Sequence, residues 1–203
     1  MYQALYRKWR PKVFSEVVGQ EHITDTLRRQ VAEGHTAHAY LFTGTRGTGK
    51  TTCARILAKA VNCLSPVDGE PCGRCEACRA VDAGTTLDIT ELDAASNNGV
   101  DQVRALREEA VYTPAVLKKR VYIIDEVHML STPAFNALLK ILEEPPEHLM
   151  FILATTELHK VPATILSRCQ RFSFKRILPR DMERQLLHIA QAESIDLTAD
   201  GAE

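Results

Sequence analysis

A strong charge of one sign is missing from this chain of 203 residues, whose 25 lysines and arginines nearly balance its 26 aspartates and glutamates. A net charge of −1 gives no bulk attraction to nucleic acid, so any such contact must be local. Apolar runs long enough to span a membrane are also missing, and the first residues lack the apolar core of a signal peptide. Repeats and low-complexity segments are absent too. We therefore expect a soluble, cytoplasmic globular chain with no membrane partner.

What the chain does contain is a phosphate-loop motif. Gly44, Gly49, Lys50 and Thr51 fit the pattern G-x-x-x-x-G-K-[ST], between an apolar run that predicts a strand and a segment with one apolar helical face. We expect Lys50 to reach the β- and γ-phosphates of ATP and the Thr51 hydroxyl to hold Mg²⁺. The expected phosphate contacts are Gly44, Thr45, Arg46, Gly47, Thr48, Gly49, Lys50, Thr51 and Thr52. The alternative, a plain glycine-rich turn, is disfavoured by the strand and helix on either side.

Four cysteines follow in the spacing Cys63-x₈-Cys72-x₂-Cys75-x₂-Cys78. Four thiolates this close together suit a tetrahedral Zn²⁺ site with no position left for substrate, so the zinc should be structural. Two disulfides or unpaired thiols are the alternatives, and the expected reducing compartment favours the metal. Cys53 and Cys169 lie outside this cluster, the former on a buried helix face.

The run 120–124 reads as a buried strand that ends in two carboxylates, Asp125 and Glu126. In a parallel sheet that end shares an edge with the phosphate loop, so Asp125 is expected to hold Mg²⁺ and Glu126 to orient and activate the attacking water. His128 is either a packing histidine or a residue linked to the nucleotide. The strand expected at 150–154 ends in Thr155 and Thr156, whose hydroxyls either position the water or only favour β-structure.

Basic and aromatic residues gather near the start, where an extended arm is expected at 5–11 because Pro11 keeps Arg10 out of the helical region. The arm is either a solvated tail or a cover for the nucleotide base. Candidate adenine or ribose contacts are Tyr6, Arg7, Pro11, Val17 and Val18. Helices are also expected near 20–33, 100–110, 132–144, 162–166 and 179–193, with further strands at 87–93 and 170–174. The polar loop residues 96–98 either cap a helix or contact a ligand or partner.

Taken together, these residues resemble the gamma/tau subunit family of bacterial DNA polymerase III, the motor subunits of sliding-clamp loaders in the AAA+ superfamily. The four-cysteine insert is the most specific feature of the resemblance. The other matching segments are 6–11, 17–20, 44–51, 125–128, 136–140, 143–146, 154–156 and 167–169.

The resemblance implies an α/β AAA+ P-loop NTPase fold with five parallel strands in the order 5-1-4-3-2. The nucleotide-binding domain would span 1–177, with a zinc-binding insert at about 63–79, and a small helical lid domain would begin at 178–203. Thr156 matches a position that senses the γ-phosphate, and Arg168 matches an arginine finger that acts in trans on the ATP of a neighbouring subunit. The chain would then be an N-terminal fragment whose lid arginine lies beyond Glu203.

The function implied by the resemblance is ATP binding and hydrolysis that loads the sliding clamp onto primed DNA. Such a chain belongs to the DNA polymerase III holoenzyme without polymerase activity of its own. Expected partners are the delta and delta-prime subunits and further gamma/tau copies in a heteropentamer-like ring, the clamp, and the backbone of primer-template DNA. Two alternatives stay open: a DExH-type helicase-like ATPase, suggested by Asp125, Glu126 and His128, and a non-hydrolysing scaffold subunit of the same complex.

Overall fold

The fold is built on a five-stranded, all-parallel sheet. A computed structural model describes residues 4–198 and Gly201, and its strand order is β2-β3-β4-β1-β5. Read in reverse, this is the predicted order 5-1-4-3-2, which is therefore confirmed. The strands are β1 (Ala39–Thr43), β2 (Ile89–Asp93), β3 (Arg120–Asp125), β4 (Leu149–Thr155) and β5 (Gln170–Ser173).

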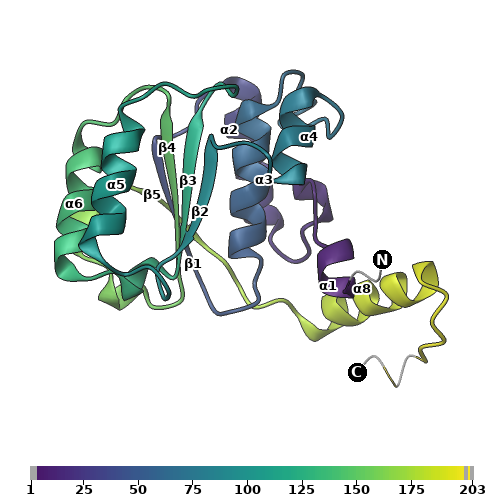
Figure 1. Cartoon of the computed structure of the whole chain (residues 1–203). Helices are drawn as coiled ribbons and strands as arrows, with labels where there is room; N and C mark the ends of the chain where they lie inside the picture. The colour runs from purple at the N-terminus through teal and green to yellow at the C-terminus, as the bar shows by residue number, and fades with distance from the viewer. Residues whose placement is uncertain (1–3, 199–200, 202–203) are drawn as a thin grey trace.

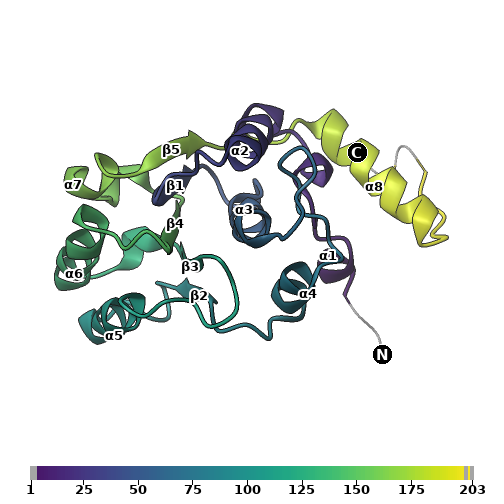
Figure 2. The ribbon, with the colours of Figure 1, turned by 90° about the horizontal axis from the view of Figure 1, so that it is seen from above.

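Helices cover both faces of the sheet, which makes three layers (Figures 1 and 2). One face carries α2 (Glu21–Glu33), α3 (Lys50–Asn62) and α4 (Glu76–Ala83). The other carries α5 (Val100–Ala110), α6 (Thr132–Glu143) and α7 (Ala163–Leu166). Three 3-10 turns complete this part of the chain: η1 (Phe14–Glu16), η2 (Val127–Met129) and η3 (Leu158–Lys160).

Two apolar cores result, one on each face of the sheet. All seven residues of β4 and all five of β1 are buried, as expected for central parallel strands that are covered on both sides. The helices begin and end where local chemistry requires it: Gly34 closes α2 in the left-handed conformation, and the Ser131 hydroxyl accepts a hydrogen bond from the Ala134 N–H to cap α6. The predicted helices and strands are thus confirmed to within a few residues.

The parallel arrangement brings the polar motifs to one edge. The phosphate loop follows β1, Glu126 follows β3, and Thr156 follows β4, and these three strands are neighbours in the sheet. Thr43, at the end of β1, pairs with Thr155 at the end of β4. Because parallel strands end at the same edge, segments more than 100 residues apart in sequence, such as 44–51 and 155–156, meet there.

The expectation of an extended arm is wrong for its first half. Leu5–Lys8 forms a single helical turn, α1, in which the Arg7 and Lys8 N–H groups donate to the Ala4 carbonyl at 2.9 and 3.1 Å. Pro11 restricts only the residue before it, so it does not prevent a turn three residues earlier.

The last helix, α8 (Pro179–Ala192), lies apart from the sheet and beside α1 (Figure 1). The Trp9 indole N–H donates to Glu193 at 2.7 Å, and its ring meets the ring of His188 edge-on. The predicted apolar face of α8 is largely open to solvent, since Met182 and Leu186 are each 46% exposed. Within residues 4–198, no helix has the length and apolar character needed to cross a membrane.

Candidate functional site

The phosphate loop joins β1 to α3 in a shape that depends on glycine. Gly44 has a φ of 145°, and a Cβ there would lie 2.6 Å from the Phe174 carbonyl oxygen, so no other residue fits without a shift of β5. Lys50 is the first residue of α3 and is only 6% exposed. Its ammonium donates to the carbonyl oxygens of Gly44 and Thr45, each at 2.8 Å. Burial lowers the pKa of Lys50, against the opposing pull of the nearby carboxylates of Glu126 and Asp125.

The two predicted Mg²⁺ ligands are in direct contact. The Thr51 hydroxyl donates to Asp125 Oδ2 at 2.6 Å, a bond that spans 74 residues of sequence. A hydroxyl and a carboxylate are oxygen ligands of the kind that Mg²⁺ prefers. The expected pairing of phosphate loop and β3 acid is therefore present as geometry.

Glu126 stands one residue further on, in a conformation that non-glycine residues seldom adopt. Its φ is 48°, in the left-handed region, which turns the chain sharply between β3 and η2. Its Oε2 accepts hydrogen bonds from the Thr156 hydroxyl at 3.0 Å and from the Thr156 N–H at 3.3 Å. The structure thus brings together the predicted water-activating carboxylate and the predicted γ-phosphate sensor. Such local backbone strain is common where a side chain must be aimed at a reacting group.

His128 lies beside the same network, and its contacts fit both of its two interpretations. Its side chain is 5% exposed, and Nδ1 lies 3.0 Å from the Thr155 hydroxyl and 3.4 Å from Glu126 Oε2. Its Nε2 lies 3.3 Å from Glu157 Oε1. His128 therefore lies between the carboxylates of Glu126 and Glu157 and is hydrogen-bonded to the Thr155 hydroxyl. Sequence reasoning missed Glu157, because it follows the strand end by two residues and carries no motif.

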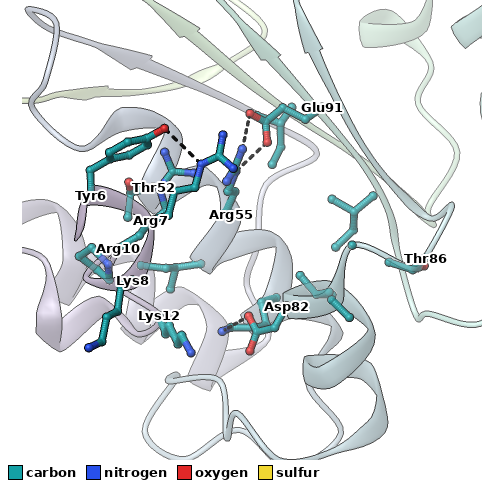
Figure 3. A pocket seen from close by; sticks show the side chains of 18 residues that line it. Tyr6, Arg7, Lys8, Arg10, Lys12, Thr52, Arg55, Asp82, Thr86 and Glu91 are labelled. Atoms are coloured by element: carbon teal, nitrogen blue, oxygen red, sulfur yellow. Dashed lines mark hydrogen bonds and ion pairs between the residues drawn. The ribbon is translucent and has the colours of Figure 1, made fainter. Parts of the chain in front are cut away.

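A pocket of about 920 Å³ lies between the N-terminal segment, α3 and α4 (Figure 3). It reaches Thr52, the third residue of α3, and its walls include Tyr6, Arg7 and Pro11 among the predicted base contacts. Val17 and Val18 do not line it. Val17 instead packs on the phosphate loop, 3.7 Å from the position of a Cβ at Gly49.

Arg10 is a lining residue that the sequence reading left out. Arg7, Arg10 and Arg55 all belong to the lining of this pocket (Figure 3). Burial first, and then the charge of Arg55, lower the pKa of Arg10. In the described part of the chain no carboxylate lies within 4.0 Å of its guanidinium, whereas Arg55 forms a bidentate pair with Glu91 at 2.7 Å. A half-buried cation without such a partner suits an anionic or polar ligand. The basic dipeptide before Pro11 was the available signal.

The four predicted metal cysteines converge. The sulfur atoms of Cys63, Cys72, Cys75 and Cys78 all lie within 4.8 Å of one another. Sulfur atoms bound 2.3 Å from a tetrahedral Zn²⁺ would be about 3.8 Å apart, and those of Cys63 and Cys75 are 4.0 Å apart. Cys53 and Cys169 lie outside the cluster, as predicted, and burial raises the pKa of each thiol to about 12.

Backbone N–H groups prepare this cluster for thiolates. The N–H of Cys72 donates to the sulfur of Cys63 at 3.3 Å, and those of Cys75 and Cys78 donate to the preceding cysteine sulfur at 3.4 Å. The N–H groups of Arg74 and Cys75 lower the pKa of Cys72 to about 5, whereas burial raises the pKa values of Cys63 and Cys78. Donors aimed at sulfur favour the charged, metal-binding form. The donor set fits a closed, structural metal site.

Arg168, the predicted arginine finger, lies away from these groups. It follows α7, whose Ile165 belongs to the core on the α5 and α6 face, whereas α3 packs on the opposite face (Figure 2). The guanidinium binds Glu143 Oε1 at 2.8 Å and the Thr164 carbonyl at 2.7 Å, and its side chain is 33% exposed. The structure therefore does not bring Arg168 to the phosphate loop of its own chain.

Comparison with known proteins now adds the family. Residues 19–178 match the family described as "DNA polymerase III, delta subunit". The chain belongs to this family. The tau subunit of Bacillus subtilis is 57% identical over 197 residues, which is 97% of this chain and 35% of that protein. The tau subunit of Escherichia coli is 51% identical over 194 residues, covering 96% and 30% respectively.

The predicted resemblance of this chain to gamma/tau subunits of DNA polymerase III is thus confirmed. The gamma/tau subunit of Mycobacterium tuberculosis gives the same result, at 52% identity over 95% of this chain and 34% of that protein. The chain spans about a third of the length of the curated relatives it matches.

Solved structures support the fold. A DNA polymerase III gamma subunit-related protein from Thermotoga maritima matches 82% of this chain and 53% of its own, with a TM-score of 0.60 and 24% identity. The RuvB Holliday junction branch migration motor of the same organism matches 96% of this chain and 58% of its own, with a TM-score of 0.66 and 19% identity. At such low identities the likeness concerns the fold alone. With the sheet order, it confirms the predicted AAA+ P-loop fold.

Proposed function

We propose that this chain binds ATP with Mg²⁺ and hydrolyses it as a motor subunit of the DNA polymerase III clamp loader. The observation that carries the proposal is the contact between Thr51 and Asp125, at 2.6 Å, beside the buried ammonium of Lys50. Lys50 would bind the β- and γ-phosphates, and Mg²⁺ held by Thr51 and Asp125 would neutralise charge that develops during phosphoryl transfer. The loop N–H groups at the start of α3 would supply the rest of the phosphate cradle.

Glu126 is the group that would activate water. Its carboxylate is held by Thr156 and His128, so its direction is set before the nucleotide arrives. A base that is already oriented needs little reorganisation free energy to reach the transition-state geometry. Thr156, bonded to Glu126, would report the γ-phosphate to this base.

Arg168 would complete a different site, that of a neighbouring subunit. Its place after α7, on the face of the sheet opposite α3, supports action in trans, because the phosphate loop of its own chain leads into α3. A guanidinium that reaches ATP only on assembly would make hydrolysis depend on the partner. Before assembly, its ion pair with Glu143 would hold it in place.

The remaining parts of the proposal follow from the same resemblance. Zn²⁺ on the four cysteines would be structural, because the four sulfur atoms leave no position for a substrate. Helix α8 would begin a small lid domain after residue 177, and its exposed apolar face would be covered by the rest of that domain. Partners would be delta, delta-prime and further gamma/tau subunits, the sliding clamp, and primer-template DNA, and the complex would act in the cytoplasm.

The test is ATP turnover by the chain alone and then with the partner subunits, the clamp and primed DNA. Stimulation by clamp and primed DNA together is the expected result. Strand separation by this chain alone would favour the helicase-like alternative and overturn the proposal. Nucleotide binding without turnover in the full complex would instead favour the non-hydrolysing scaffold.

A further inference from the structure

The loop between the first two metal-site cysteines, residues 64–71, folds back onto the N-terminal part of the chain. We call it the cysteine loop. Val67 and Glu70 exchange two backbone hydrogen bonds, at 3.0 and 2.8 Å, which close a tight turn through Gly69. Gly69 is buried with a φ of 78°, and a Cβ there would overlap the carbonyl oxygen of Arg28 in α2. The turn is therefore packed directly on α2.

Glu70 uses both of its carboxylate oxygens to hold the N-terminal segment. The Phe14 N–H donates to Oε2 at 2.7 Å and the Ser15 N–H donates to Oε1 at 2.9 Å. The Arg28 guanidinium lies 3.4 Å from Oε1, and the Glu70 side chain is 16% exposed. Phe14 and Ser15 begin η1, where no side chain of η1 itself provides a cap. A carboxylate from 55 residues away thus satisfies the free N–H groups of this turn.

The turn that Glu70 caps leads straight to the nucleotide site. Phe14 is fully buried and Val17 is 8% exposed, and Val17 packs on the phosphate loop at Gly49. On the other side of the turn, Pro11 and Arg10 line the pocket that reaches Thr52. Movement of η1 would therefore displace both the pocket wall and the cover of the phosphate loop.

A second contact ties the same insert to the opposite wall of that pocket. Lys59 of α3, whose side chain is 4% exposed, donates to Asp82 of α4 at 2.8 Å. Asp82 and Lys59 both line the pocket (Figure 3). The insert is thus connected to α3, which carries the phosphate loop, and to the N-terminal segment, which faces it.

We propose that Glu70 is a positioning residue for the base side of the nucleotide site, and that metal on the four cysteines fixes Glu70 in place. The inference rests on the proposed ATP site. Cys63 and Cys72 flank the cysteine loop, so one metal ion bound by both anchors its two ends. The anchored loop presents Glu70 to η1, and η1 holds segment 10–18 against the pocket and the phosphate loop. Metal binding to the insert therefore supports nucleotide affinity without contact between metal and nucleotide.

The experiment compares ATP with inorganic tripolyphosphate, each with Mg²⁺, by titration calorimetry on the whole chain. Glu70→Gln keeps the size of the side chain but faces one backbone N–H with an amide N–H₂. ATP affinity should fall about tenfold, equivalent to about 1.4 kcal/mol. Tripolyphosphate touches only the phosphate loop and not the pocket wall, so its affinity should fall much less than that of ATP. Glu76→Gln is the matched control, because Glu76 is an exposed glutamate of the same insert and should leave both affinities unchanged.

Removal of metal from the unsubstituted chain by a chelator, with thiols kept reduced, should reproduce the same split. This arm also covers the case in which Glu70→Gln does not fold. Equal losses for ATP and tripolyphosphate would mean general loosening of the fold and would overturn the proposal, as would unchanged ATP affinity in both arms. If the unsubstituted, metal-loaded chain binds tripolyphosphate but gains nothing from the adenosine part, the base-side site itself is refuted. If it binds neither, the proposed function fails first.

Discussion

Replacement of Lys50 by methionine should leave the ligand-free chain at least as stable as before while removing its response to ATP. The Lys50 ammonium is 6% exposed and bonds only to two carbonyl oxygens. Within the described residues no carboxylate lies within 4.0 Å of it. A buried charge without an ion-pair partner costs several kcal/mol of desolvation, in the range of about 2–5, and methionine of similar length carries no such cost.

The change in stability of the ligand-free chain is the balance of lost hydrogen bonds and avoided desolvation. The two lost hydrogen bonds contribute about 1–3 kcal/mol each, since one partner is charged, and water can reach the carbonyls of the exposed loop. The free energy lost with these hydrogen bonds nearly cancels the desolvation cost that methionine avoids. The melting temperature of the variant should therefore stay equal or rise by up to about 4 °C for a domain of this size. Burial lowers the pKa of Lys50, so unfolding is accompanied by proton uptake between that lowered pKa and the ordinary lysine pKa of 10.5. The free energy of unfolding of the unsubstituted chain should therefore rise as the pH rises across that window. The difference between its free energy of unfolding and that of the methionine variant should become smaller.

Thermal unfolding with and without Mg²⁺-ATP is the assay. At about 100 times the dissociation constant, ATP should stabilise the unsubstituted chain by about 2.7 kcal/mol, or roughly 5–11 °C. The methionine variant should shift by less than about 1 °C. Lys140→Met is the control: it removes an exposed lysine of α6, on the other face of the sheet, and should change neither the melting temperature nor the ATP shift.

Two results would refute this reasoning. A full ATP shift in the Lys50 variant would mean that Lys50 does not bind the phosphates. A large fall in its ligand-free melting temperature would mean that the ammonium stabilises the empty loop, contrary to the desolvation argument.

Three further outcomes are expected. His128→Asn should lower turnover about 10- to 100-fold with unchanged ATP affinity, because Glu126 loses its fixed direction; a parallel loss of affinity would contradict this. Arg168→Ala should leave ATP binding intact and lower turnover about 10³-fold only in the assembled complex; an equal loss in the isolated chain would exclude action in trans. Asp88 is 1% exposed and accepts three backbone N–H groups, which together with Arg120 outweigh burial and hold its pKa below 3.8. Asp88→Asn should therefore cost about 3 kcal/mol in urea unfolding at neutral pH, and the difference should vanish as the pH falls from 3.8 through the lower folded-state pKa; a pH-independent difference would contradict it.

Much of the sheet was predictable because its strands have a clear local sequence pattern. The runs 39–42, 121–124 and 149–154 are apolar throughout, and a glycine, an acid or a threonine of a motif follows each run within two residues. Chain order and parallel pairing then bring those ends together. For that reason the pairing of Thr51 with Asp125 followed from the sequence, with the family resemblance supplying the strand order.

What escaped prediction depends on contacts between segments distant in sequence. Leu5–Lys8 forms a turn whose next residue, Trp9, is bonded to Glu193, 184 positions away. Glu70 reads as an ordinary polar loop residue, and only the folded cysteine loop aims it at η1. Arg10 has the sequence signature of an ordinary solvated cation. Only the folded structure shows that burial and the charge of Arg55 lower its pKa. Such roles arise from packing geometry, which local pattern does not encode.

Arg168 follows α7 on the α5 and α6 face of the sheet, whereas the phosphate loop leads into α3 on the other face, and this separation has a consequence for symmetry. Two copies related by a two-fold axis would bring like surfaces together, finger to finger, and complete neither site. Only head-to-tail contacts satisfy the proposed chemistry, and such contacts have polarity. In an open arc of subunits, the first copy would hold ATP that no arginine reaches, and the last would extend an arginine toward no ATP. The arc would therefore have two chemically different ends, each free to receive a subunit of another kind.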